Sequence, residues 1–275
     1  NISDVYTFDK ESICRRWFGT TDERHPGVQS IMQRGERFLA GEITLLRKHS
    51  YSKPEYCLSP AQVRASFAHY GWEKVVGFHA KSVPNRVHEF MQMEALDRVG
   101  GDGLFIHPIL GQEERGAGTQ EVILAAYEAL INTRYPKDRV MMSGFYGNIP
   151  YAGPREAVFA AICKKNYGCT HFVVGKDQTG TSDSCGSLDV ATLFEKLGDI
   201  GIEPVFFDEV RFDPTEDRYL EVPGRSGTQE LLSISSIVMH EYISAGNQPP
   251  EWMMRPEVSE VLLRIGSDGG QVFQV

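Results

Sequence analysis

The sequence predicts a doubly wound α/β domain, in which a parallel sheet is covered by helices on both faces. Apolar runs of strand length alternate with amphipathic segments of helix length along most of the chain. These runs are continuous rather than alternating in polarity, which is typical of strands buried on both faces. Polar, glycine-rich loops follow several of them, and ligands of such folds bind at the carboxyl ends of the strands.

The alternation of elements begins at residue 59. Ser59 is the expected N-cap of a helix, with Pro60 as its first residue and Gly71 at its end. Strands are then predicted at 74–78, 103–110, 139–145, 171–175 and 203–210. Further helices are predicted at 85–100, 119–135, 153–168 and 188–198, followed by two near the end of the sequence at 233–246 and 256–266.

The first part of the chain has a different pattern. Strand candidates occur at 4–8 and 41–46, around a turn-rich stretch at 18–28. We therefore expect two parts, a partial β-rich region at 1–58 and an α/β domain at 59–275. The opening residues do not form a signal peptide and resemble a strand entered within a domain.

Composition limits the classes of partner. The chain has 275 residues, 41% hydrophobic content and a formal net charge of -9. This charge argues against binding to nucleic acid or to an anionic membrane. The five cysteines form no C-x-x-C pair, which disfavours a disulfide framework or structural zinc and favours a reducing, cytoplasmic location. No apolar run approaches the roughly 20 residues that span a bilayer.

The loop after the first strand of the α/β domain is a candidate anion site. It carries His79, Lys81 and Ser82, and Asn85 and His88 follow three residues apart at the start of a helix. The N-terminus of a helix attracts anions, and these side chains suit phosphate groups. The alternative is that His88 is a satisfied core histidine and Lys81 a solvated charge.

Three further loops have a similar character. The second contains Ala152, Gly153 and Arg155 at a helix start, where glycine permits close approach of a base or ribose. A plain helix cap with a surface arginine is the alternative there. The third loop follows the strand at 171–175 and contains Gly175, Lys176, Asp177, Gln178 and Thr179. Together these loops indicate a nucleotide or another polyanion.

The fourth loop precedes a helix near the end of the sequence. Ser235 can cap that helix and donate to phosphate, although a plain N-cap is the commoner role.

Long motifs of this chain resemble those of the ATP sulfurylase (sulfate adenylyltransferase) family. The resemblance covers nearly the whole chain and is most specific in "YAGPREA" and "KNYGCTHFVVG". It implies a Rossmann-like nucleotidyltransferase domain preceded by the end of a PUA-like region. It also implies transfer of AMP from ATP to sulfate with release of pyrophosphate, with Mg²⁺ accompanying ATP. Members of the family are often oligomeric, so a homodimer is expected.

The resemblance assigns roles residue by residue. Lys81, His88 and Lys176 are the expected catalytic residues, and the protein supplies no metal ligands of its own. The acceptor oxyanion is expected at His79, Lys81, Ser82, Gln178 and Thr179. The nucleotide is expected at Asn85, His88, Ala152, Gly153, Arg155, Gly175, Asp177 and Ser235.

Several positions depart from the family pattern. Where the family has Gln and Arg in its first loop, this chain has His79 and Lys81. Lys176 and His240 likewise replace arginines, and lysine lacks the planar fork that grips an oxyanion with two hydrogen bonds. Three hypotheses follow: an ordinary ATP sulfurylase, a nucleotidyltransferase with another acceptor, such as a phosphonate or sulfonate, or another nucleotide, and a non-catalytic nucleotide-binding relative.

Overall fold

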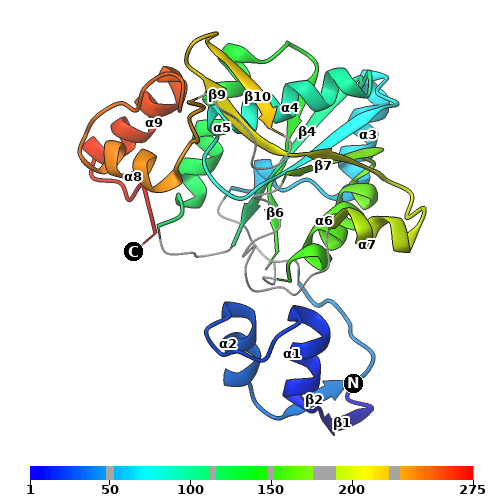
Figure 1. Ribbon diagram of the computed structural model, residues 1–275. Helices are drawn as coiled ribbons and strands as arrows, with labels where there is room; N and C mark the ends of the chain where they lie inside the picture. The colour runs from blue at the N-terminus through cyan, green and yellow to red at the C-terminus, as the bar shows by residue number, and fades with distance from the viewer. Residues whose placement is uncertain (48–52, 112–115, 148–151, 176–189, 223–229, 275) are drawn as a thin grey trace. The chain divides into compact units, whose positions relative to one another are not determined.

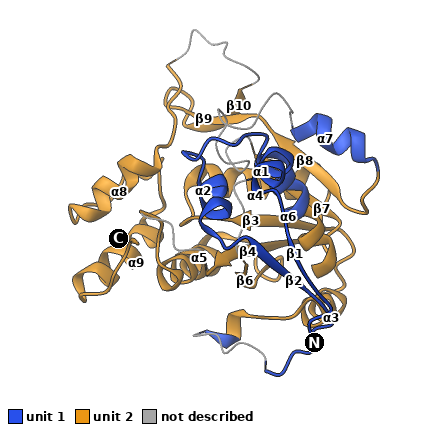
Figure 2. Cartoon of the chain, turned by 90° about the horizontal axis from the view of Figure 1, so that it is seen from below, with its two compact units in different colours: residues 1–54, 149–160, 177–198 blue, residues 55–148, 161–176, 199–275 orange. Residues whose placement is uncertain are grey.

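The computed structural model describes residues 1–47, 53–111, 116–147, 152–175, 190–222 and 230–274. The chain, drawn in Figure 1, forms two compact units, which Figure 2 colours separately. Unit 1 contains residues 1–54, 149–160 and 177–198, and unit 2 contains residues 55–148, 161–176 and 199–275. Each unit is described by itself.

Unit 2 is built on a six-stranded sheet with the strand order β5-β4-β3-β7-β8, and β6 pairs with the carboxyl end of β4. All of these pairings are parallel. The strands are β3 (Val75–Ala80), β4 (Gly103–Leu110), β5 (Val140–Met142), β6 (Phe145–Tyr146), β7 (His171–Gly175) and β8 (Glu203–Phe207). The parallel sheet predicted from the sequence is confirmed.

Unit 2 also contains helices, several of which alternate with these strands as the sequence predicts (Figure 1). They are α3 (Pro60–Tyr70), α4 (Arg86–Arg98), α5 (Gln120–Arg134), α6 (Pro154–Tyr167), α8 (Ser236–Ser244) and α9 (Pro256–Ser267), and a 3₁₀ turn, η1 (Pro54–Tyr56), precedes α3. The residues of α6 are divided between the two units.

One face of the sheet packs against α4 and α5. Phe78 on β3 and Ile106 on β4 are fully buried, and they belong to one hydrophobic cluster with Leu96 of α4 and Tyr127 of α5. Neighbouring residues of a strand point to opposite faces, so the even-numbered positions of β3 and β4 form this side of the core.

The odd-numbered positions face α3 and α6. Phe67 of α3 packs edge-on against Phe105 of β4, with 5.5 Å between ring centroids. A methyl group added to Gly77 of β3 would lie 3.1 Å from both Cys169 Sγ and Lys164 Cγ, so glycine lets the end of α6 approach this strand closely. Helices therefore cover both faces of the sheet, which makes the domain doubly wound.

The predicted caps of α3 are confirmed in detail. Ser59 Oγ accepts a hydrogen bond from Gln62 N, and the Gln62 side chain accepts one from Ser59 N. Gly71 ends the helix with a φ of 70°, a left-handed conformation that glycine adopts without steric cost.

The strand predicted at 203–210 is two strands in the structure. β8 ends at Phe207, and β9 (Glu209–Asp213) then pairs in antiparallel fashion with β10 (Arg218–Val222). Asp217 precedes β10 with a φ of 51°, a conformation that the short aspartate side chain tolerates. Asp208 and Glu209 interrupt the apolar run at this break, and they are the signal in the sequence that could have revealed the change of sheet.

One of the two strands predicted for unit 1 is formed, and the other is not. β1 (Asp4–Thr7) pairs in antiparallel fashion with β2 (Arg37–Ala40), and the expected strand at 41–46 is not formed. Ile43 and Leu46 are each 94% exposed there, so they have no apolar surface to cover them. The described part of this unit also contains α1 (Lys10–Phe18), α2 (Pro26–Gln33) and α7 (Val190–Leu197).

The small core of unit 1 is made by helices. Cys14 and Phe18 of α1 pack with Val28 of α2 and with Ala152. His25 is the N-cap of α2, because its Nδ1 accepts from the amides of Gly27 and Val28. Among residues 1–47 and 53–58, which the structure describes, the expected β-rich character is therefore limited to one pair of strands.

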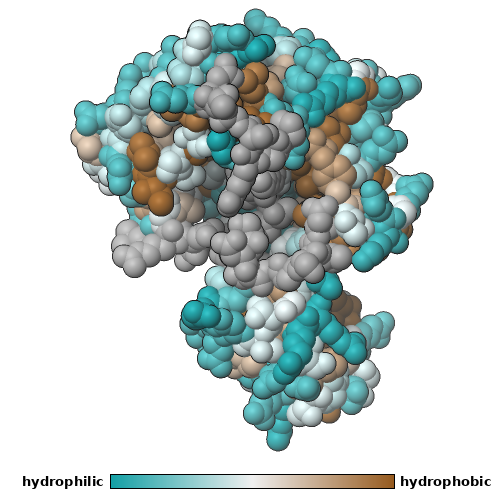
Figure 3. Space-filling model, viewed as in Figure 1, coloured by the Kyte–Doolittle hydropathy of each residue, from teal (hydrophilic) through white to brown (hydrophobic). Residues whose placement is uncertain are grey.

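None of the helices in the described ranges combines the length and apolar character needed to cross a bilayer. Figure 3 shows hydrophilic residues over much of the visible surface, with apolar patches between them.

Candidate functional site

Two of the four predicted loops meet at one pocket of unit 2. Lys81 and Ser82, which follow β3, lie on its wall together with Ser236 and His240 of α8. The cavity has a volume of about 290 Å³. Its other lining residues are Val83, Gly116, Ala117, Gly118, Met239, Ile243, Met254, Leu262 and Phe273. The structure therefore brings a cationic loop and the start of a helix to a common cavity beyond the end of β3.

The C-terminal segment forms part of this pocket. Phe273 makes a β-bridge to Gly118, and Gln274 N donates to the carbonyl of Ala117 at 2.7 Å. The Phe273 ring lies 4.0 Å from the His240 ring between centroids. The pocket thus has apolar walls with a few polar groups, which is the usual character of a small-molecule site.

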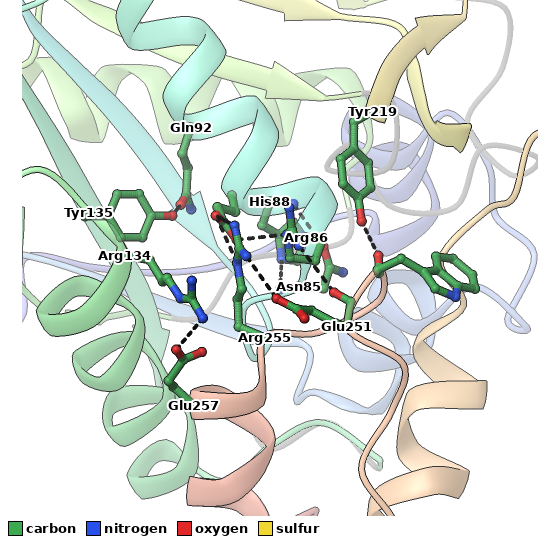
Figure 4. Close-up of polar contacts among 12 residues, drawn as sticks. Asn85, Arg86, His88, Gln92, Arg134, Tyr135, Tyr219, Glu251, Arg255 and Glu257 are labelled. Atoms are coloured by element: carbon green, nitrogen blue, oxygen red, sulfur yellow. Dashed lines mark hydrogen bonds and ion pairs between the residues drawn. The ribbon is translucent and has the colours of Figure 1, made fainter. Parts of the chain in front are cut away.

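Asn85 and His88 form a reciprocal cap at the start of α4, shown in Figure 4. Asn85 Oδ1 accepts from His88 N at 2.9 Å, and His88 Nδ1 accepts from Asn85 N at 3.4 Å. Their helical spacing, which suggested a shared anion site, therefore also produces a capping box. Their contact with ATP phosphates stays a prediction.

His88 is neutral at physiological pH. Burial lowers the pKa of its imidazole to about 4, although the backbone of Val83 acts in the opposite direction. A neutral ring supplies a hydrogen bond but no positive charge, so charge for an anion must come from other groups.

An ion-pair network joins α4 to α9. Arg255 donates to both carboxylate oxygens of Glu89, at 2.6 Å from Nη2 and 2.9 Å from Nε. Arg86 Nε lies 3.1 Å from the same carboxylate, and Glu251 lies on the outer side of Arg255 (Figure 4). The side chains of Arg255 and Glu89 are only 18% and 14% exposed, so this pair is shielded from solvent.

Replacing Arg255 with alanine should lower the free energy of unfolding by about 2 kcal/mol. Among the described residues, the shielded carboxylate of Glu89 would then keep only Arg86 to compensate its negative charge. Urea unfolding would measure the loss. Arg264→Ala is the matched control, since Arg264 is exposed on the same helix. A loss no larger than that of the control would show that the pair contributes nothing to stability.

His79 lies in a buried polar pair with Lys164 of α6. Lys164 Nζ is 2.7 Å from His79 Nδ1, and the two residues are 0% and 4% exposed. Burial lowers the pKa of Lys164 to about 7, against the opposing influence of Cys169 and Cys163. Burial, followed by the charge of Lys164, places the pKa of His79 well below its usual value.

Aromatic rings and a second histidine surround this pair. His107 of β4 is opposite His79 in the strand register and is fully buried. Phe145 lies below the Lys164 ammonium, 5.4 Å from the ring centroid, and Tyr167 packs against His107 at 4.4 Å. Burial and the charge of Lys164 both hold the pKa of His107 well below the usual range.

Two predicted nucleotide contacts occupy the ends of elements in unit 2. Ser235 is the N-cap of α8, and its Oγ accepts from Val238 N at 3.4 Å. Gly175 is the last residue of β7, at the same edge of the sheet as the loop after β3. Capping does not exclude a phosphate contact, and the roles of both residues remain predictions.

The second predicted loop belongs to unit 1. Ala152 is buried in the small core of that unit, and its amide donates to Glu156 Oε2 at 3.3 Å. Gly153 has a φ of 56°, and Arg155 is exposed in the first turn of α6. The remaining predicted residues lie outside the described residues: Lys176, Asp177, Gln178 and Thr179.

Sequence reasoning missed Lys164. Its helix places Ala157, Ala161 and Lys164 at intervals of four and three residues, and all three are buried. A lysine at helical spacing with buried alanines is the signal that could have identified it. His240 was noted only as a departure from the family pattern, and the pocket role of Phe273 had no signal in the sequence.

Within the ranges given above, no group of three or more His, Cys, Asp or Glu side chains is arranged to hold a metal ion. The described cysteines, Cys14, Cys57, Cys163 and Cys169, form no disulfide bond with one another.

The domain is a doubly wound sheet, and a cationic loop and the starts of helices lie beyond its carboxyl edge. These features are typical of α/β proteins that bind nucleotides. Comparisons agree with this class. Residues 54–265 match the ATP-sulfurylase family model, and residues 1–48 match a PUA-like domain. The chain belongs to the ATP-sulfurylase family, and it is an enzyme of the sulfate adenylyltransferase type.

Curated relatives extend the match over nearly all of the chain. The sulfate adenylyltransferase of Thermococcus onnurineus is 38% identical over 263 residues, covering 95% of this chain and 69% of that protein. The sulfate adenylyltransferase of Staphylothermus marinus is 40% identical over 263 residues, covering 95% and 68%. Among solved structures, a hexameric APS kinase from Thiobacillus denitrificans shares the fold, with a TM-score of 0.65 and 24% identity over 84% of this chain and 44% of that chain.

Proposed function

We propose that this enzyme transfers AMP from MgATP to sulfate and releases pyrophosphate. The observation that carries the proposal is the pocket at which Lys81 and Ser82 meet Ser236 and His240. A cation and hydroxyl groups beside a helix start suit two anions that must be held together. The curated relatives are named sulfate adenylyltransferases, which supports the choice of sulfate as the acceptor.

The proposed chemistry is an in-line displacement. A sulfate oxygen attacks the α-phosphorus of ATP, a new phosphorus–oxygen bond forms, and the bond to the leaving pyrophosphate breaks. Sulfate is already a dianion, so no general base removes a proton. The protein positions the two substrates and compensates the charge that develops on the leaving group, while Mg²⁺ arrives with the ATP phosphates.

Lys81 is the described cation best placed for this task, because it lies on the pocket wall. We assign it to the acceptor and the transition state, with Ser82 beside it. The neutral Asn85–His88 cap is assigned to the ATP phosphates, together with Gly175 and Ser235. Lys176, Asp177, Gln178 and Thr179 keep their predicted roles, and Ala152, Gly153 and Arg155 are assigned to the nucleoside.

A different acceptor is the second candidate. The apolar side chains of the pocket, among them Met239, Ile243 and Phe273, favour an oxyanion that carries an organic group. A sulfonate or phosphonate would present oxygens to Lys81 and its apolar part to these walls.

Pyrophosphate release from MgATP tests the proposal, with sulfate, methanesulfonate and methylphosphonate as separate acceptors. Formation of ATP from adenosine 5′-phosphosulfate and pyrophosphate should be measured as well. Turnover with sulfate is the expected result. Turnover only with an organic acceptor would favour the second candidate. A thermal shift with ATP but no turnover would instead indicate a non-catalytic nucleotide-binding protein.

We place this reaction in the reducing cytoplasm, which suits described cysteines that form no disulfide bond with one another. A homodimer remains our expectation, and light scattering of the purified protein would test it.

A further inference from the structure

The buried ammonium of Lys164 has an unusual partner. No carboxylate among the described residues pairs with it, and its close polar contact is the imidazole of His79 at 2.7 Å. Burying a lysine without an opposite charge is costly. Because this contact does not offset the free energy lost on burying the ammonium, we look for a role of Lys164 other than stabilising the fold.

The direction of the hydrogen bond follows from the chemistry of the two groups. A charged ammonium can only donate, so His79 Nδ1 must accept. A neutral imidazole carries one proton, and that proton is therefore on Nε2. The contact with Lys164 thus selects one of the two tautomers of His79.

The selected tautomer leaves a donor unused. His79 Nε2 is buried and has no hydrogen-bond partner within the described part of the chain. His79 lies near the carboxyl end of β3 and precedes Lys81 of the pocket by two residues, although His79 itself is not among the residues that line that pocket. A buried N–H group without a partner is unfavourable, which indicates a ligand atom as its missing acceptor.

We propose that Lys164 is a positioning residue for the acceptor: it fixes His79 in the tautomer that presents Nε2–H to an acceptor oxygen. This inference rests on the proposed function, because it concerns the oxyanion of that reaction. Lys164 does not touch the acceptor and acts through the orientation and protonation of His79.

The protonation of the pair depends on all of the groups that face it. These are His107 on β4, Lys81 after β3, Cys163 on α6 and Cys169 after α6. The two thiols keep raised pKa values, so they stay neutral near pH 7 and do not compensate the ammonium. Loss of the proton from Lys164 would permit either tautomer of His79.

Histidine-labelled protein tests the inference directly. Long-range ¹H–¹⁵N spectra distinguish the tautomers, and His79→Gln identifies the His79 signal by its disappearance. In the wild type at a pH below the Lys164 pKa of about 7 we expect the Nε2–H form alone, with a signal that moves when sulfate is added to protein saturated with an ATP analogue. In Lys164→Met we expect mixed tautomers and a KM for sulfate raised about ten-fold or more, with the KM for ATP within about two-fold.

Lys165→Met is the matched control. Lys165 is the next residue of α6, is exposed, and donates to the carbonyl of Ile200 at 2.6 Å. This control should keep the wild-type spectrum and the wild-type KM. Lys164→Arg should restore part of the sulfate affinity, because its guanidinium can still donate to Nδ1.

Two results would overturn the inference: an unchanged tautomer in Lys164→Met, or a wild-type His79 signal that saturating sulfate does not move. A wild-type enzyme without turnover on sulfate overturns the proposed function instead, and the spectra still decide the role of Lys164. If Lys164→Met does not fold, a pH titration of the wild type replaces it. The ¹⁵N signals of Lys164 and His79 are then followed together: the Nε2–H form should give way to a mixture as Lys164 loses its proton, and a His79 tautomer that stays unchanged once Lys164 is deprotonated contradicts the inference.

Discussion

Replacing Lys81 with alanine should lower kcat/KM for adenylyl transfer by about 10²–10³-fold, the loss typical of a charged or donor group that stabilises the transition state. Lys81 lies on the wall of the pocket where we place the acceptor, and it is partly buried. Its charge acts there in an environment with mostly apolar walls, where electrostatic interactions are stronger than in water. Initial rates of pyrophosphate release at varied sulfate and ATP would measure the loss.

Two variants make this measurement specific. Lys74→Ala removes an exposed lysine at the opposite end of the same strand, where its ammonium donates to the carbonyl of Val99 at 3.4 Å. This variant should keep the wild-type rate. Lys81→Arg keeps the charge and should recover most of the activity. If Lys81→Ala were as active as Lys74→Ala, the positive charge that stabilises the transition state would have to come from another loop.

The α/β unit was predictable because its signals are local and strong. Continuous apolar runs marked β3, β4 and β7, and the strand predicted at 74–78 differs from Val75–Ala80 only at its ends. Ser59 begins α3 because its side chain accepts a hydrogen bond from a backbone amide of the first turn. Gly71 ends α3 because it adopts the left-handed conformation.

Unit 1 was less predictable because its signals conflict. The apolar residues Ile43 and Leu46 suggest a strand but are exposed, whereas the paired strand begins at Arg37. Asp9 and Gly19 cap α1 in the ordinary way, and this signal was available in the sequence. The small core formed with Ala152 joins segments far apart in the chain, which local patterns do not reveal.

The candidate site was predictable in its elements but not in its contacts. Spacing placed Asn85 and His88 together, yet spacing cannot distinguish a phosphate site from a helix cap. That Lys81 and His240 line one pocket depends on how α8 packs beside α9, which local sequence patterns do not show. Lys164 was missed because a lysine is assumed to be solvated unless its helical neighbours are examined for burial.

Replacing Lys164 with methionine should change the pH dependence of stability. The pKa of Lys164 is lowered from 10.5 to about 7 in the folded protein, chiefly by burial. Between these values the unfolded chain binds a proton that the folded protein does not bind, so the wild type gains stability as pH rises. The gain should be about 1.4 kcal/mol per pH unit relative to Lys164→Met, which lacks this proton.

Urea unfolding of both proteins at intervals from about pH 7 to about pH 10 measures this difference. Titration of the other groups is common to the two proteins and largely cancels. His79 is neutral throughout this range, since its pKa is well below the usual value. Lys164→Met should therefore exceed the wild type in free energy of unfolding by the largest amount near pH 7. At that pH the substitution removes a buried group that is partly charged.

Lys165→Met again serves as the control, because it removes an exposed lysine at the next position of the same helix. Its stability difference from the wild type should not vary with pH. If the difference for Lys164→Met were equally constant, Lys164 would hold its proton in the folded protein as firmly as in the unfolded chain. The ammonium would then donate to His79 at every pH in the range, and the tautomer selected by the pair would not depend on pH.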